Sequence, residues 1–267
     1  MVTVNEICQF LEESAPLRLA ETWDNVGLLV GRADREVRRV MTCLTLTMSV
    51  AQEAIDQETQ MIVTHHPILF RATKKITDSS EEGRLLLSLA EAGIAVYSPH
   101  TAFDSAATGI NQRIAESLNL TEIKPLRILD NQQEVGAGRF GMISTPCDRD
   151  QLLEDVAAIT KAEYLEYSWQ GTTKAHRIAI ACGSAADFLQ DAARMGCDTF
   201  ITGEARFHSV LESRSHNLNL ILTGHFCSER PAIEQLAEEV SRRFLSLVCT
   251  SSKNDTNPLS IHFGRRS

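Results

Sequence analysis

The residues most suited to chemistry are two adjacent histidines, His65 and His66, which directly follow the short apolar run 61–64. The β-branched residues of that run favour an extended backbone, and Pro67 prevents a central strand from continuing beyond it. We therefore expect both imidazoles at the end of a strand, and in open α/β sheets ligands collect at the carboxyl ends of the strands. Neutral imidazole is a common metal ligand. One buried and one surface histidine would explain this pair, taken alone, equally well.

Two further histidines each precede a carboxylate by four residues, in the pairs His100 and Asp104, and His225 and Glu229. Residues four apart share one side of a helix, so each pair could present two ligands to a metal ion. Alternatively, the two carboxylates cap helices while the histidines bond to backbone carbonyls. That alternative explains each residue singly, but it does not explain why the pairs recur after corresponding predicted strands.

An internal repeat relates these pairs to each other. Residues 39–66 match residues 177–204 at one constant offset, and residues 96–104 match residues 221–229 after a change of length. Both copies alternate between strand and helix patterns, as βαβ units do, and such crossovers are right-handed. Two related halves that face each other would bring both histidine–carboxylate pairs and the adjacent histidines to one cleft.

Hydrophobic periodicity indicates the elements that must position these residues. It predicts helices over 5–14, 49–56, 80–92 and 110–118, and strands over 40–44, 61–64 and 94–97. The polar and glycine-rich stretch 121–141, which includes the polar residues 130–134, is the best candidate for a boundary between substructures. We therefore expect a first α/β repeat, residues 1–125, and a second, residues 126–267, whose C-terminal part packs on the first. The first carries His65, His66, His100 and Asp104, and the second carries Glu204, His208, His225 and Glu229.

Composition places the chain among ordinary globular proteins, with 267 residues, 43% of them hydrophobic and 23% charged. A net charge of −9 makes binding to nucleic acid or to an anionic membrane unlikely on electrostatic grounds. The seven cysteines are scattered and form no Cys-x-x-Cys pair, which argues against both a disulfide framework and a zinc ribbon. There is no basic, apolar leader and no run of membrane-spanning length, so we expect a cytoplasmic protein.

The ligand types favour zinc, iron or manganese, because the candidate residues offer nitrogen and carboxylate oxygen but no thiolate. Successive side chains of a strand point in opposite directions, so His65 and His66 more easily serve two ions than one. Two ions about 4 Å apart with a bridging carboxylate form the geometry of two-metal hydrolytic sites. Either Asp104 or Glu229 could be the bridge. No nucleophile elbow, P-loop or dinucleotide fingerprint is present, so those enzyme classes are excluded.

Five motifs, in this order, resemble those of the NIF-three-like dinuclear metal-centre proteins, often labelled GTP cyclohydrolase I type 2 homologues. The motifs are residues 23–27, 64–67, 98–104, 202–208 and 224–229, and the likeness covers nearly the whole chain. The resemblance implies an α/β fold of two intertwined, duplicated repeats with mixed sheets flanked by helices. It also implies a ring-shaped homo-hexamer whose metal ions face an internal cavity.

Carried over residue by residue, the metal ligands of the family fall on residues that all have the required type: His65, His66, Asp104, His225 and Glu229. His100 and His208 would then lie near the metal ions as candidates for general acid–base catalysis. The chain departs from the family at residues 44–47, where Leu-Thr-Leu-Thr replaces the frequent Leu-Asp-x-Thr. If that aspartate orients a ligand, Thr45 would weaken or retune the site.

Two functions remain open at this point. The first is a metal-dependent hydrolase with two divalent metal ions that acts on a small, nucleotide-like substrate; the cyclohydrolase label is a specific version of it. No residue pattern identifies a guanine or pterin pocket. The second is a non-catalytic protein, either a metal-binding scaffold or an interaction partner that uses the surface of the oligomer.

Overall fold

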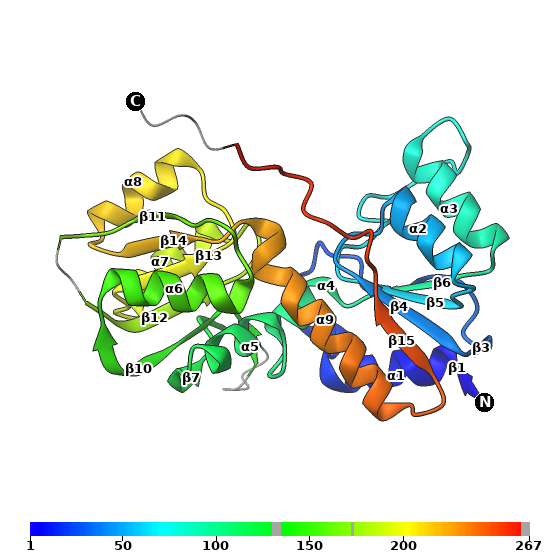
Figure 1. The fold of residues 1–267 in the computed structure, drawn as a ribbon, viewed down its shortest axis with the longest axis horizontal. Coiled ribbons are helices and arrows are strands. Elements are labelled where there is room, and N and C mark those ends of the chain that lie inside the picture. Colours follow the sequence, from blue (N-terminus) through cyan, green and yellow to red (C-terminus); the bar gives the residue numbers. More distant parts are fainter. Residues whose placement is uncertain (130–134, 172–173, 263–267) are drawn as a thin grey trace.

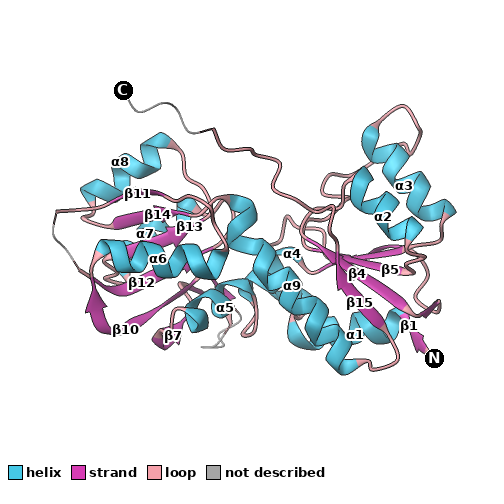
Figure 2. Ribbon diagram, viewed as in Figure 1, coloured by secondary structure: helices cyan, strands magenta, loops and turns pink. Residues whose placement is uncertain are grey.

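The computed structural model describes residues 1–129, 135–171 and 174–262. It shows two α/β lobes side by side, bridged by one long helix, α9 (His225–Arg243) (Figure 1). Helices lie on both sides of each sheet (Figure 2). The polar stretch 130–134, predicted as part of a boundary, lies outside the described residues.

The helices predicted from periodicity are present, with ends shifted by one residue. They are α1 (Val4–Ser14), α2 (Met48–Asp56), α3 (Glu81–Glu91) and α5 (Ile110–Ser117). A capping box starts α1: the Thr3 hydroxyl accepts from the Glu6 amide, and the Glu6 carboxylate accepts from the Thr3 amide. Further helices are α4 (His100–Ser105), α6 (Arg149–Thr160), α7 (Leu189–Arg194) and α8 (Phe207–Ser215), with 3-10 turns η1 (Leu17–Leu19) and η2 (Ala186–Phe188).

The first lobe is built on a five-stranded mixed sheet. In sheet order its strands are β15 (Val248–Ser251), β4 (Arg39–Cys43), β5 (Met61–Thr64), β6 (Ala95–Ser98) and β2 (Gly27–Val30). The first four run parallel, and β2 pairs antiparallel with β6. Met61 packs into the core with α1 and α9, and Ile62 packs into the core with α2 and α3. Because helices cover both faces, these strands are continuous apolar runs.

The second lobe contains a six-stranded mixed sheet. In sheet order its strands are β11 (Glu166–Ser168), β14 (Asn219–Leu222), β13 (Thr199–Thr202), β12 (Ala175–Ala181), β10 (Arg139–Cys147) and β7 (Thr121–Lys124). The strands β12, β13 and β14 run parallel. Two small ladders complete the sheets: β1 (Val2–Thr3) pairs with β3 (Glu36–Val37), and β8 (Arg127–Ile128) pairs with β9 (Gly136–Ala137).

The structure confirms the internal repeat. The parallel strands β4, β5 and β6 of one sheet correspond to β12, β13 and β14 of the other, and each set has an antiparallel strand beside its third member. The two repeats exchange strands. β7 lies within residues 1–125, the predicted first repeat, but joins the second sheet, and β15 lies late in the predicted second repeat but joins the first sheet. One hydrophobic core therefore spans both lobes and includes Val40 and Ile178. The predicted fold class of two intertwined, duplicated α/β repeats is confirmed.

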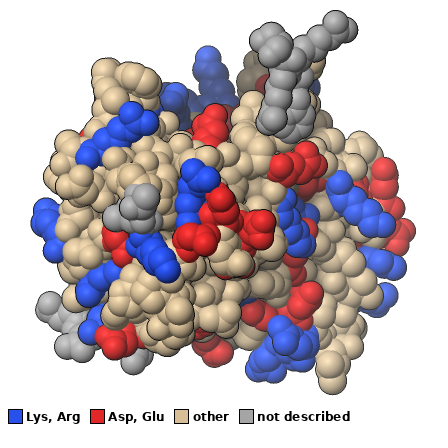
Figure 3. All heavy atoms as spheres, turned by 60° about the vertical axis from the view of Figure 1, so that its left-hand side comes forward, with Lys and Arg blue, Asp and Glu red and all other residues tan. Residues whose placement is uncertain are grey.

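The charged side chains on the face that the second lobe presents form no surface of one sign. Acidic and basic side chains are interspersed on its described part, without a continuous basic band (Figure 3). Within the described ranges, no helix combines the length and the apolar character that crossing a membrane requires.

Candidate metal centre

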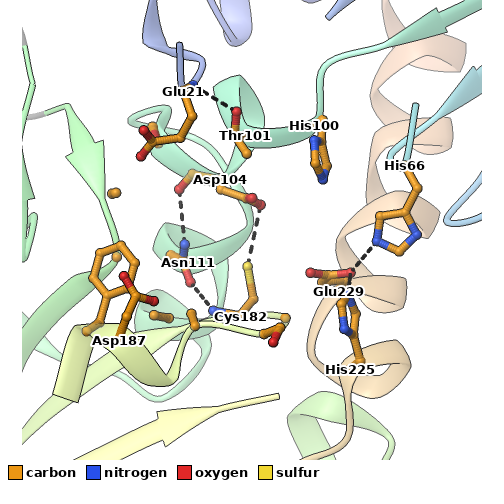
Figure 4. Close-up of a pocket in the computed structure, with 18 of the residues that line it drawn as sticks. Glu21, His66, His100, Thr101, Asp104, Asn111, Cys182, Asp187, His225 and Glu229 are labelled. Atoms are coloured by element: carbon orange, nitrogen blue, oxygen red, sulfur yellow. Dashed lines mark hydrogen bonds and ion pairs between the residues drawn. The ribbon is translucent and has the colours of Figure 1, made fainter. Parts of the chain in front are cut away.

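The carboxyl ends of β5 and β6 and the start of α9 meet at a cavity of about 600 Å³ between the lobes. His66, His100, Asp104, His225 and Glu229 line it, coming from the loop after β5, from α4 and from α9 (Figure 4). The structure therefore brings both histidine–carboxylate pairs and His66 to one cavity.

The backbone after β5 fixes the two adjacent histidines. The His65 amide donates to the Cys43 carbonyl at 3.0 Å, and the His66 amide donates to the Leu44 carbonyl at 2.9 Å, so the strand pairing with β4 continues past Thr64. The two side chains then point in different directions. His65 is 1% exposed and lies behind the cavity wall, whereas His66 reaches the cavity.

Glu229 is the centre of the histidine cluster. Its Oε2 lies 3.1 Å from His66 Nε2 and 3.2 Å from His225 Nε2. Its other oxygen, Oε1, lies 4.0 Å from His65 Nε2. The two carboxylate oxygens thus face different histidines. Gly183 leaves room for this carboxylate, since a β-carbon there would lie 2.3 Å from Glu229 Oε1 and its φ is +67°.

His65 has a buried ring without a hydrogen-bond partner. Neither ring nitrogen bonds to any described residue, and the nearest carboxylate atom, Asp104 Oδ1, lies 3.6 Å from Nε2. Buried polar groups are normally satisfied, and leaving one unpaired costs about 1–3 kcal/mol. A cation beside His65 Nε2 would satisfy this nitrogen and would offset the negative charge of Asp104 and Glu229, whose nearest oxygens lie 3.6 and 4.0 Å from Nε2. The residues present therefore fit a metal ion, which the donor types also favour.

Each of the other three histidines has an oxygen partner on its outer nitrogen, Nδ1. Thr45 Oγ1 lies 2.8 Å from His66 Nδ1. Glu204 Oε1 lies 3.1 Å from His225 Nδ1. Such contacts fix the ring orientation and tautomer of metal-binding histidines, and here they turn Nε2 towards the inner side, where Nε2 of His66 and of His225 meets Glu229. The threonine that departs from the family pattern therefore holds His66 rather than leaving it unsupported.

The outer partner of His100 is Asp24, whose Oδ1 lies 2.8 Å from Nδ1. The amides of Asn25 and Thr101, at 2.8 and 3.2 Å, and the Thr101 hydroxyl also donate to this buried carboxylate. Burial would raise the pKa of Asp24, but the hydrogen bonds from His100 and Thr101 lower it to about 2. Asp24 is therefore ionised at neutral pH. His100 itself has a φ of +30°, a strained value of the kind that clusters at functional sites.

The pKa values at the cluster are shifted in opposite directions. Burial and the negative charge of Glu229 raise the pKa of Asp104 to about 7. Burial opposes ionisation of Glu229 too, but hydrogen bonds from His225 and His66 hold its pKa below the usual range. The hydrogen bond to Glu229 raises the pKa of His225 to about 9, although burial opposes this. Desolvation lowers the pKa of His65 well below 6.5. Clustered shifts of this kind are typical of functional sites.

The raised pKa of His225 predicts a pH dependence of stability in the metal-free protein. Because the folded protein binds this proton more tightly than the unfolded chain, the stabilisation is complete below pH 6.5 and is lost as the pH rises to about 9. Asp104 contributes with the same sign up to about pH 7. We expect urea unfolding in chelator to give a free energy that falls across this range. A His225→Gln variant should show a flatter profile above pH 7, and an unchanged slope would contradict the assignment.

The structure brings six of the predicted site residues together and places His208 elsewhere. Two groups of three residues have ligand atoms within 4.8 Å of one another: His65, His66 and His100, and His66, His225 and Glu229. Asp104 joins them through its contact with His65. His208 is exposed on α8, its ring packs beside Phe207, and it is not among the residues that line the cavity.

Sequence reasoning missed the roles of Asp24 and of a small polar network under the cavity. Asn111 Nδ2 donates to the Asp104 carbonyl at 3.1 Å, and Asn111 Oδ1 accepts from the Cys182 amide at 2.8 Å. The Cys182 thiol donates to Asp104 Oδ1 at 3.4 Å (Figure 4). These contacts join α4 to the second sheet. The Trp-Asp-Asn motif at 23–25 was a usable signal for Asp24, but its partner lies 76 residues away.

Comparisons with known proteins agree with this fold and motif set. The family model for Duf34/NIF3 (NGG1p interacting factor 3) matches residues 2–258. A GTP cyclohydrolase 1 type 2 homolog from Clostridium acetobutylicum is 34% identical over 238 residues, covering 89% of this chain and 89% of that protein. NIF3-like protein 1 from Drosophila melanogaster is 31% identical over 258 residues, covering 93% of this chain and 86% of that protein.

A solved structure shows the same fold at lower sequence identity. The Bacillus cereus protein related to NIF3 superposes with a TM-score of 0.86 at 19% identity, covering 98% of this chain and 99% of that one. The family match extends over nearly the whole chain, and relatives above 30% identity cover most of it. The chain therefore belongs to the Duf34/NIF3 family.

Proposed function

We propose that this protein binds two divalent metal ions in the cavity and uses them to hydrolyse a small, nucleotide-like substrate. The observation that carries the proposal is the buried His65 ring, which has no hydrogen-bond partner among the described residues and faces two carboxylates. A protein that needed only a packed core would not retain such a group, because an apolar residue would avoid the cost.

The ligand atoms divide into two sets around Glu229. His66 and His225 approach Oε2, and His65, with Asp104 beside it, faces Oε1. One set would hold each ion, with Glu229 shared between them, and the contacts of Thr45 and Glu204 would support the imidazoles from outside. Of the two bridges that the sequence left open, the geometry favours Glu229. Zinc, iron and manganese all suit this combination of nitrogen and oxygen donors.

His100 is the best candidate for proton transfer. The ionised Asp24 accepts the Nδ1 proton of His100, which leaves Nε2 as the nitrogen that can accept a proton from the cavity. Bound divalent ions would supply Lewis-acid polarisation of the substrate and make water more acidic. His208, the other candidate from the sequence, lies on the exposed face of α8, so we assign the proton-transfer role to His100. The ring-shaped hexamer stays a prediction.

The decisive experiment is elemental analysis of protein purified without chelator and without a nickel column, combined with hydrolysis assays on nucleotides. We expect about two metal ions per chain, as in two-metal hydrolases, and turnover that a chelator abolishes and the metal restores. His66→Ala should lose metal and turnover. His208→Ala, which changes an exposed histidine on α8, is the matched control and should keep both.

Two outcomes would contradict the proposal in different ways. A metal content near zero that dialysis against zinc, iron or manganese cannot restore would show that the histidines are structural. Two bound ions without turnover of any nucleotide would contradict the hydrolase and leave the metal-binding scaffold.

A further inference from the structure

Two large aromatic side chains at the mouth of the cavity are exposed to solvent. Trp23 is 58% exposed and Phe70 is 50% exposed, and both line the cavity that holds the candidate metal centre. We call these two residues the aromatic lip. Single exposed apolar residues are common on protein surfaces. Two exposed aromatic rings in contact with each other at the mouth of a polar cavity are less easily explained by chance. Their apolar faces would gain free energy if a ligand covered them.

The aromatic lip has a defined geometry and sits next to the histidine cluster. The ring centroids of Trp23 and Phe70 are 5.8 Å apart at an interplanar angle of 68°. Each ring also makes an edge contact with His100, at 6.1 Å for Trp23 and 6.2 Å for Phe70. A ligand that covers the lip is therefore within reach of the histidine that Asp24 orients.

Hydrogen bonds hold the aromatic lip in place before any ligand arrives. Asn25 Nδ2 donates to the Leu69 carbonyl at 2.7 Å, which ties the loop that carries Trp23 to the residue before Phe70. Directly after Trp23, the Asp24 carboxylate is fixed by Thr101 and His100. A preformed surface of this kind binds a rigid ring without the entropic cost of ordering a loop.

The charges in the cavity indicate whether a ligand binds there through a charged or an uncharged part. The described residues that line the cavity include the guanidinium of Arg127, the imidazole of His225, which pairs with Glu229 at 3.2 Å, and four carboxylates: Glu21, Asp104, Asp187 and Glu229. Arg127 is already paired, with Asp187 at 3.1 Å and with Asp191 at 2.7 Å. Without metal ions the cavity therefore attracts anions poorly, and a ligand must gain its affinity from an uncharged part.

We propose that the aromatic lip binds a planar heteroaromatic ring of the substrate by stacking on Trp23, so that the polar part of the substrate points towards His100 and the metal ions. The identity of this ligand as the substrate rests on the proposed function, whereas the stacking itself does not. A cavity of about 600 Å³ lies within the usual range for sites of small organic ligands. Stacking on an aromatic side chain suits any nucleobase, since every base has a π-face.

The test measures binding of guanosine and adenosine, which are uncharged, to the metal-free full chain by isothermal titration calorimetry, with ribose as the probe that lacks the base. We expect both nucleosides to bind and ribose not to bind. Trp23→Ala should weaken nucleoside binding about tenfold or more, as alanine substitution at base-stacking residues does. Trp23→Phe keeps a flat ring and should restore most of the affinity. Phe207→Ala removes another exposed aromatic ring, on α8 outside the cavity, and should have no effect.

The possible outcomes separate this proposal from the proposed function. Equal affinity of the unmodified protein and Trp23→Ala for nucleosides, or no nucleoside binding to the unmodified protein, would overturn the stacking role. If Trp23→Ala changed the oligomeric state in solution but left nucleoside binding unchanged, the stacking role would also be overturned. Trp23 would then belong to an interface between copies of this chain. Because the titration uses neutral probes without metal, a failure of metal loading or hydrolysis would leave its result intact.

Discussion

If the protein binds metal as proposed, replacing Glu229 by alanine should remove both of the proposed metal ions, not only one. Its two carboxylate oxygens face different histidines: Oε2 lies within 3.2 Å of the Nε2 atoms of His66 and His225, and Oε1 lies 4.0 Å from His65 Nε2. Loss of an outer partner of a metal ligand already costs about 10–100-fold in metal affinity. Removal of a ligand shared by two ions should exceed that, so we expect metal content near zero by elemental analysis and no metal-dependent turnover.

Two further variants make this expectation specific. Glu229→Gln keeps the volume and one acceptor oxygen but removes the charge, and we expect it to retain less metal than the unmodified protein and more than Glu229→Ala. Glu238→Ala removes an exposed carboxylate from the same helix, α9, and should retain the full metal content. If Glu229→Ala retained as much metal as the unmodified protein, the bound ions would lie elsewhere.

The largest expected loss of stability comes from Arg139, a buried arginine on β10 that is 1% exposed. Its guanidinium donates to the carbonyls of Gly136, Gly138 and Ala106, at 2.5, 2.8 and 2.6 Å, and to Gln112 Oε1 at 2.8 Å. It thereby ties the second sheet to the end of α4, the helix that carries His100 and Asp104. Arg139→Met fills similar space but removes the guanidinium donors from these acceptors; the Ala106 carbonyl keeps the Gly109 amide as a donor at 3.1 Å, and the Gly136, Gly138 and Gln112 oxygens lose their bond to the guanidinium. Since each buried unsatisfied group costs about 1–3 kcal/mol, we expect a loss of at least about 3 kcal/mol.

Chemical denaturation monitored by circular dichroism would measure this loss. Arg149→Ala is the matched control, because Arg149 is a partly exposed arginine that bonds to its neighbour Asp150 and lies over the exposed Tyr167 ring, and it should change the free energy of unfolding by less than about 1 kcal/mol. A loss below about 1 kcal/mol in Arg139→Met would mean that water replaces the guanidinium at these carbonyls.

Local pattern was sufficient for the main helices and strands of the first lobe and for the residues that the structure brings together as the histidine cluster. The runs that form β4, β5 and β6 are apolar because helices cover both faces, and that feature is visible in the sequence. The repeat then placed the pairs His100 and Asp104, and His225 and Glu229, at matching strand ends. His66 followed from its position after β5.

The features that could not be predicted depend on contacts between distant segments. The strand β15 is not an apolar run, and it is a strand because it pairs with β4 about 200 residues earlier. The support of His66 by Thr45 depends on the Asp255 carboxylate, which accepts from the Leu44 amide at 2.5 Å. No local pattern links residue 255 to residue 44. For His208 the motif indicated proximity to the metals, but α8 turns its first residues outward and leaves Phe207 72% exposed.

The late position of β15 in the chain also affects how the protein is made. About 200 residues separate β4 from its neighbour β15, and at about 5–20 residues per second the ribosome needs roughly 10–40 s to synthesise them. During that time the nascent first lobe has an open strand edge, which is a site for aggregation.

His65 and His66 are also made long before Glu229, so an ion that arrives early meets histidines without their shared carboxylate. If the protein binds metal as proposed, loading should therefore follow translation and completion of the first sheet.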